Sequence, residues 1–218
     1  MKHQLQFTFL LFLFVQVLKA QDENPPRYII GGGLRIFVSN NISSDDTQIN
    51  IAPNKGEYVE TGFAIAPYAG KYLTQRQIFG LVVSYELTIN KPNSPSNEKY
   101  TANAISTGVF YRYLLNPGNK LVVQIEPSIL FQYQTAGYKS DNLPNNNLNL
   151  NALVGRIEIS PLISYALSDK LNLVGRFGAL QFLTGYWDYG GGNDKQTFSH
   201  FSTNLNLSYL QLRLEVKL

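Results

Sequence analysis

The stretch that decides the fold is LQLRLEVKL, residues Leu210–Leu218. Apolar residues alternate with polar or charged residues over the whole stretch. An extended chain therefore carries one apolar face and one polar, mostly charged face. In a soluble sheet the charged face would meet water. The alternation is also typical of a strand in a closed transmembrane barrel, whose apolar face contacts lipid and whose charged face lines the interior.

Seven earlier segments also have strand-like composition and are separated by runs of turn residues. We predict eight strands, at Tyr28–Val38, Tyr58–Lys71, Gln77–Asn90, Thr101–Leu115, Lys120–Thr135, Leu148–Tyr165, Leu171–Tyr186 and Phe198–Leu218. Long gaps rich in Asn, Asp, Ser, Gly and Pro are Ser39–Glu57, Lys91–Tyr100, Ala136–Asn147 and Trp187–Thr197. Short gaps with tight-turn residues are Tyr72–Arg76, Asn116–Asn119 and Ala166–Lys170.

The long and short gaps alternate along the chain. An up-and-down transmembrane barrel has this arrangement, with brief turns on its periplasmic rim and extended loops on its outer rim. A secreted β-sandwich, the alternative, gives no reason to sort its loops by length. We therefore predict an all-β fold, a transmembrane antiparallel up-and-down β-barrel of eight strands. An even number of strands places both termini on the periplasmic side.

The N-terminal residues indicate export. Met1–Ala20 has a short polar head, an apolar core over Phe7–Val15 and a small residue before the expected cleavage site, which is the pattern of a signal peptide. The core is too short for a membrane-spanning helix, which needs about 20 apolar residues. We predict a signal peptide at residues 1–20, a short periplasmic segment at 21–27 and the barrel domain at 28–218. The expected location is the outer membrane of a Gram-negative cell.

Composition narrows the possible partners and cofactors. The chain has no cysteine, so it offers neither disulfides nor thiolate metal ligands. Loss of the signal peptide would remove His3 and leave His200 as the remaining histidine, which argues against a histidine metal centre. It would also take Lys2 and Lys19 from the 18 basic residues, leaving 16 against 15 acidic ones. This balance gives no reason to expect nucleic acid as a partner, and we expect no cofactor or metal.

The inward faces of the predicted strands collect charges of both signs. An eight-stranded barrel is just wide enough for side chains to fill it, and buried charges are costly unless they are paired. We therefore predict an interior ion-pair network that plugs the barrel; a path for protons or small solutes through it is the alternative. Its predicted members are Arg35, Arg112, Arg156, Arg176, Arg213, Glu86, Glu126, Glu158 and Glu215.

The signal, the eight strands, the sorted loops and the alternating stretch together resemble the small outer-membrane β-barrel family of the OmpA and OmpX type. The turn Tyr165–Leu171 is most similar to the versions found in Bacteroidota. The resemblance covers roughly the whole expected mature chain. It implies contact with outer-membrane lipid, including lipopolysaccharide, and a possible outer-membrane protein partner.

One stretch suggests catalysis. His200-Phe201-Ser202-Thr203-Asn204 loosely resembles the His-x-Ser-Asn stretch of PagL-type lipid A deacylases, in which histidine activates a membrane-facing serine. His200 and Ser202 have the same even numbering as the apolar residues of Leu210–Leu218, which predicts that both face the membrane. The nearest later acid, Glu215, is predicted to point inward near the opposite rim, so a triad lacks its orienting group. We therefore expect no enzymatic activity.

The sequence favours a structural or surface-interaction protein, or a subunit of an outer-membrane complex, because long loops can present a binding surface. Two alternatives stay open. One is a PagL-like lipid A deacylase that uses His200 and Ser202. The other is a narrow OmpW-like carrier of small hydrophobic solutes, which a lateral opening or an apolar lumen would indicate.

Overall fold

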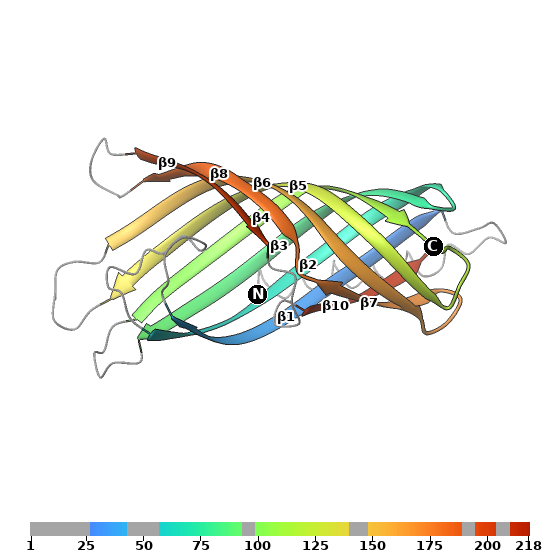
Figure 1. Ribbon diagram of the computed structural model, residues 1–218, viewed down its shortest axis with the longest axis horizontal. Coiled ribbons are helices and arrows are strands. Elements are labelled where there is room, and N and C mark those ends of the chain that lie inside the picture. The colour runs from blue at the N-terminus through green and yellow to red at the C-terminus, as the bar shows by residue number, and fades with distance from the viewer. Residues whose placement is uncertain (1–26, 43–56, 93–98, 140–147, 189–194, 204–209) are drawn as a thin grey trace, which may run out of the picture.

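The computed structural model describes residues 27–42, 57–92, 99–139, 148–188, 195–203 and 210–218. The predicted signal peptide and most of each long gap lie outside these ranges. The strands are β1 (Tyr28–Ile42), β2 (Glu57–Thr74), β3 (Gln77–Pro92), β4 (Lys99–Leu114), β5 (Leu121–Lys139), β6 (Leu148–Ala166), β7 (Leu171–Phe177), β8 (Leu180–Asp188), β9 (Lys195–Thr203) and β10 (Leu210–Lys217). Figure 1 shows them inclined around a common axis. In the described part of the chain, no helix is long and apolar enough to cross a membrane.

The strands form one antiparallel sheet that closes on itself. Its order is β5-β4-β3-β2-β1-β10-β7-β6-β8-β9, and pairing of β5 with β6 closes the ring. β6 pairs with β7 near the short turns and with β8 farther along, so these two segments occupy one position in the wall. β10 and β9 share the next position, because they pair with β7 and β8 respectively. The ten segments therefore make an eight-stranded barrel, and the predicted fold class is confirmed.

The seventh wall strand contains a bulge that the sequence did not predict. Leu162 pairs with Arg176 and Ile159 pairs with Leu180, so β6 advances three residues while its neighbour advances four. The extra residue lies at Gly178–Ala179, where Gly178 has a φ of 73° that favours glycine. One extra residue reverses the facing of every later side chain. The prediction of one uninterrupted strand at Leu171–Tyr186 is therefore wrong.

The eighth wall strand shows a larger mismatch. Leu210 pairs with Phe177 and Thr203 pairs with Leu180, so the two described segments are seven residues apart in sequence while their partners are three apart. Partners across a ladder face the same side of the wall, and the bulge makes the inward residues of β7 even-numbered and those of β8 odd-numbered. Consequently, inward residues have odd numbers on β10, which pairs with β7, and even numbers on β9, which pairs with β8. The predicted strand at Phe198–Leu218 is thus two segments with opposite facing.

The two surfaces of the barrel differ as the alternation predicts. Side chains that point outward from β3, such as Phe79, Leu81 and Val83, are exposed, although they are large and apolar. Inward positions of the same wall are buried or half-buried and include both apolar and charged residues. The apolar surface is therefore on the outside, which is the reverse of a soluble globular domain.

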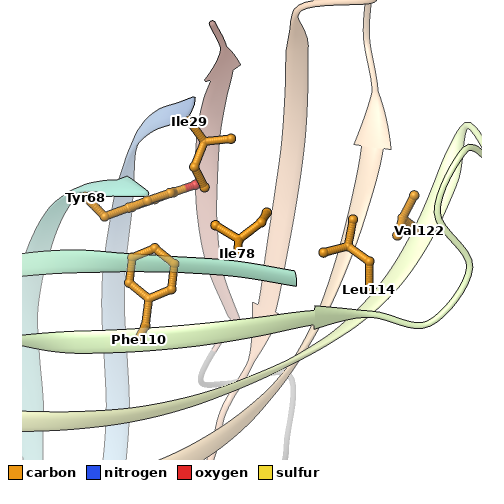
Figure 2. Packing of buried hydrophobic residues seen from close by; sticks show 6 residues of the cluster. All are labelled: Ile29, Tyr68, Ile78, Phe110, Leu114 and Val122. Carbon is orange, nitrogen blue, oxygen red and sulfur yellow. The ribbon is translucent and has the colours of Figure 1, made fainter. Parts of the chain in front are cut away.

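A hydrophobic cluster fills the barrel next to the short turns. Its members are Ile29, Tyr68, Ile78, Phe110, Leu114 and Val122, drawn in Figure 2. The rings of Tyr68 and Phe110 meet edge to face with centroids 5.8 Å apart. Gly31 leaves room for this packing, because a Cβ atom there would lie 2.3 Å from Cζ of Tyr68. The lumen is thus closed at this end partly by apolar packing.

The two described chain ends lie together at the rim that carries the short turns. The amide of Arg27 donates to the carbonyl of Leu218 at 2.8 Å, and the amide of Leu218 donates to the carbonyl of Tyr28 at 2.9 Å. We call this rim the turn end and the opposite rim the loop end. Figure 1 places the C-terminus and the short turns at the same end of the molecule.

Candidate functional site

The structure brings all nine predicted interior charges into ion pairs. The six pairs are Arg35–Glu86, Arg112–Glu126, Arg112–Glu215, Arg156–Glu158, Arg176–Glu158 and Arg213–Glu126. Their N–O distances run from 2.5 to 4.0 Å. The residues come from seven of the ten strands and project into the same lumen.

The tightest group lies at the turn end. Arg112 of β4 contacts Glu126 of the neighbouring strand β5 at 2.7 Å and also reaches Glu215 of β10. β10 is not a neighbour of β4 in the wall, so this second contact crosses the lumen. Arg213 joins the group through Glu126 at 2.9 Å. The side chains of Arg112 and Glu215 are 0% and 1% exposed, so these charges depend on one another for stabilisation.

Polar neighbours complete the hydrogen bonding of this group. The hydroxyl of Tyr68 donates to Glu215 at 3.1 Å, and the amide of Asn172 donates to its other oxygen at 3.2 Å. Gln211 accepts two hydrogen bonds from Arg213. The guanidinium of Arg112 also lies 5.4 Å from the ring centroid of Tyr68, within cation–π range. We call Arg112, Glu126, Arg213, Glu215 and Tyr68 the turn-end plug.

A second group sits nearer the middle of the lumen around Glu158. This carboxylate accepts from Arg176 at 2.6 Å and from the hydroxyl of Ser128 at 3.1 Å. Arg176 also donates to Ser160 at 2.9 Å. Arg156 is 4.0 Å from Glu158 and donates to Gln132. Glu158 is buried, whereas the two arginines are about one-fifth exposed. This group is therefore more exposed to solvent than the turn-end plug.

The third pair, Arg35 with Glu86, lies about midway along β1 and β3. Its N–O distance is 2.6 Å, and the two side chains are 21% and 37% exposed. Arg35 also lies over the ring of Phe37 at 4.8 Å. The charges of the turn-end plug are therefore more deeply buried than those of Arg35 and Glu86.

Several interior polar residues were not predicted as members of these groups. Tyr68, Asn172 and Gln211 bind plug charges, and Gln124 donates to Ser164 at 2.7 Å elsewhere in the lumen. The sequence does carry a signal for them, because each has the inward facing of its strand. The pattern of charged residues alone does not predict these uncharged members.

The structure contradicts the prediction that His200 and Ser202 face the membrane. They pair with Leu183 and Gln181, which are inward positions of β8. Ser202 is buried, and its hydroxyl accepts from Gln181 at 2.9 Å. Nε2 of His200 is buried without a hydrogen-bond partner among the described residues. The facing prediction failed because it carried the parity of β10 across residues 204–209 into β9.

Among the described residues, no ladder completes the wall between β1 and β9. β1 pairs with β10 only from Ile29 to Leu34, although its pairing with β2 continues to Ile42. β9 pairs with β8, and within the described ranges no ladder joins it to β1. Figure 1 shows the two strands well apart toward the loop end. We call this stretch the lateral seam.

Comparisons with known proteins give similarity of structure only. Neither a protein-family model nor a curated protein matches the chain. The crystal structure of Neisserial surface protein A matches 88% of this chain and 96% of its own, with 13% identity and a TM-score of 0.39. A major outer membrane protein from Thermus thermophilus matches 89% of this chain and 100% of its own, with 11% identity and a TM-score of 0.47.

Proposed function

We propose that this protein spans an outer membrane as an internally plugged barrel and has a structural or surface-interaction role, alone or as a subunit of an outer-membrane complex. The single observation that carries the proposal is the turn-end plug inside an apolar-walled barrel. We assign no enzymatic activity, and we propose that the turn end with both chain ends faces the periplasm.

The outer surface supports the membrane location. Large apolar side chains point outward on all eight wall strands, for example Leu81, Phe131 and Leu214. Exposing so many of them to water would be unfavourable, by about 25 cal/mol for each Å² of apolar surface. A hydrocarbon environment removes that cost, and the ladders between neighbouring strands satisfy backbone groups that lipid cannot.

The interior argues against an open pore. Arg112, Glu126 and Glu215 meet across the lumen with almost no exposure, and the hydrophobic cluster packs beside them. An ion would have to displace these paired charges to pass. The protein would then act through what it presents at its surface.

A two-part experiment tests the proposal on the full-length protein. Refolded into liposomes, it is expected to migrate faster on a detergent gel before boiling than after, which is the behaviour of a membrane barrel. In planar bilayers it should show no steady conductance. Equal migration before and after boiling would refute the membrane barrel, while a large steady conductance would refute the plug.

The lateral seam favours a second candidate, a carrier of small hydrophobic solutes. Ile36 of β1 and Phe201 of β9 border the seam, and their exposed fractions of 73% and 65% exceed those of all other large hydrophobic residues described. A solute entering from outside could leave sideways through such a gap without passing the plug. Because the chain has no cysteine, a reducible bifunctional thiol reagent can join Ile36→Cys to Phe201→Cys across the seam. Uptake that is blocked by the reagent and restored when its disulfide is reduced would support the carrier, and unchanged uptake would eliminate it.

The lumenal position of Ser202 also supports the absence of deacylase activity. A membrane lipid would have to enter the barrel to reach a serine that is buried and bonded to Gln181. We expect the lipid A of cells with and without the protein to have the same number of acyl chains by mass spectrometry. Loss of a chain that depends on Ser202 would overturn this assignment.

A further inference from the structure

The outer wall carries a groove that none of the interior chemistry explains. It has a volume of about 480 Å³ and lies over β5, β6, β8 and β9. Gly155 lines it on an outward position, where a Cβ atom would make an ordinary contact of 3.7 Å with the carbonyl oxygen of Thr184. Phe131, Leu153 and Tyr186 contribute apolar walls. The groove has the largely apolar lining that a site for an acyl chain needs.

Two hydroxyl groups line this groove on a face that is otherwise apolar. Oγ1 of Thr184 donates to the carbonyl oxygen of Phe198 at 3.3 Å and lies 3.0 Å from Oγ of Ser199. With the Thr184 hydrogen used on the carbonyl, Ser199 donates to Thr184 and keeps its own oxygen free to accept. The groove therefore offers a hydrogen-bond acceptor, which suits an N–H or O–H group near the head of a lipid.

A lysine side chain places a positive charge on the loop-end side of the groove. Lys195 has the same outward facing as Thr197 and Ser199 on β9 and lies toward the loop end. Its ammonium group is 5.2 Å from the ring centroid of Tyr186. Asp188 is opposite Lys195 in the ladder, yet none of the ion pairs among the described residues joins the two. An anionic group can thus approach Lys195 from the membrane interface.

We propose that this groove binds lipid A from the outer leaflet, with a phosphate at Lys195, an amide or sugar donor at Ser199 and an acyl chain over Gly155. The amide-linked chains of lipid A supply the donor that the groove needs, whereas the ester linkages of glycerophospholipids do not. The inference rests on the proposed outer-membrane location, which puts the loop end in the leaflet that contains lipid A.

The chain supplies matched controls for the two main contacts. Gly155→Leu fills the groove, whereas Gly32→Leu adds the same side chain at an outward glycine on β1 with nothing within 4 Å. Lys195→Gln removes the charge above the groove. Lys120→Gln removes a lysine that lies 5.0 Å from the ring of Tyr165 at the opposite rim. Each pair changes the same chemistry at two places on the outer surface.

The test measures binding of purified lipid A to the full-length protein in phosphatidylcholine nanodiscs by native mass spectrometry. Gly155→Leu should weaken binding about tenfold, as expected when about two methylenes lose their contacts. Lys195→Gln should weaken it about fivefold. Gly32→Leu and Lys120→Gln should bind like the unaltered protein. Asp188→Asn should bind more tightly, because it removes a repulsive charge.

Several results would overturn the inference. These are equal losses for Gly155→Leu and Gly32→Leu, competition by phosphatidylglycerol as effective as that by lipid A, or occupation of the groove by a second copy, seen as dimers that Gly155→Leu abolishes. Gel migration before and after boiling is checked for every variant. A protein that folds in nanodiscs but shows no site-dependent binding refutes only the lipid site. Failure of the unaltered protein to enter nanodiscs refutes the proposed function itself.

Discussion

Two ion-pair groups in the lumen use the same chemistry in different surroundings. At the turn end, Arg112 is 0% exposed and contacts two carboxylates, whereas Arg35, midway along β1, is 21% exposed and contacts one. Buried ion pairs are weak sources of net stability but are very costly to break, and exposed pairs contribute little in either sense. The difference indicates that the turn-end plug closes the barrel, while the Arg35–Glu86 pair is nearer to a surface salt bridge.

The largest expected effect is at the centre of the turn-end plug. Glu126→Gln removes the carboxylate shared by Arg112 and Arg213 and leaves positive charge buried without compensation. We expect the free energy of unfolding to fall by about 3–5 kcal/mol. Urea titration in liposomes, followed by the fluorescence of Trp187, the single tryptophan, measures it. A loss below about 1 kcal/mol would remove the distinction between the turn-end plug and the Arg35–Glu86 pair.

A smaller effect is expected from Gly31→Ala, which crowds the plug without changing a charge. The new Cβ atom would lie 2.3 Å from Cζ of Tyr68 and 2.8 Å from the carbonyl oxygen of Leu214, which cannot move freely. We expect a loss of about 2 kcal/mol by the same titration. Gly32→Ala is the control, because open space surrounds that position. Similar stabilities for the two variants would contradict the packing of Tyr68 against β1.

Tyr68→Phe removes one hydroxyl from the plug and keeps the ring. Glu215 then loses the hydrogen bond of 3.1 Å but retains Arg112 and Asn172. We expect a loss of about 1.5 kcal/mol, the lower end for hydrogen bonds to charged groups. Tyr85→Phe, at a tyrosine that bonds Asn103 elsewhere, is a matched control. An unaffected Tyr68→Phe protein would show that the hydroxyl adds nothing to the plug.

The smallest effect is predicted for the Arg35–Glu86 pair. Glu86→Gln breaks the pair with Arg35, but both groups are partly exposed and water can replace the lost contact. We expect a change of less than about 1 kcal/mol, which decreases further at high salt. Measured beside Glu126→Gln, it completes the comparison. A loss as large as that of Glu126→Gln would show that the dielectric environment is uniform along the lumen.

Period-two alternation predicted much of this structure because the first six wall strands keep one register, apart from a shift between Tyr72 and Thr74 next to a short turn. The two errors, in the continuity of the seventh wall strand and in the facing of the eighth, occurred where Gly178 adds a residue and β9 is out of phase with β10. The inward polar residues shift from Arg176 to Gln181, a change from even to odd that signals the bulge. Alternation identified which charged residues point into the lumen. It did not identify which of them form ion pairs, because pairing depends on how far along the barrel axis each residue lies.

β10 has a consequence for how the molecule assembles. Its pairing with β1 joins segments about 180 residues apart, and the same short strand delivers both Arg213 and Glu215 to Arg112 and Glu126. Contacts so distant in sequence form slowly. Ring closure and completion of the turn-end plug are therefore one event. In a chain without β10, Arg112 would keep only Glu126 as an ion-pair partner, and the sheet would stay open. Such an open sheet exposes unpaired edges at β1 and β7, where other chains can pair.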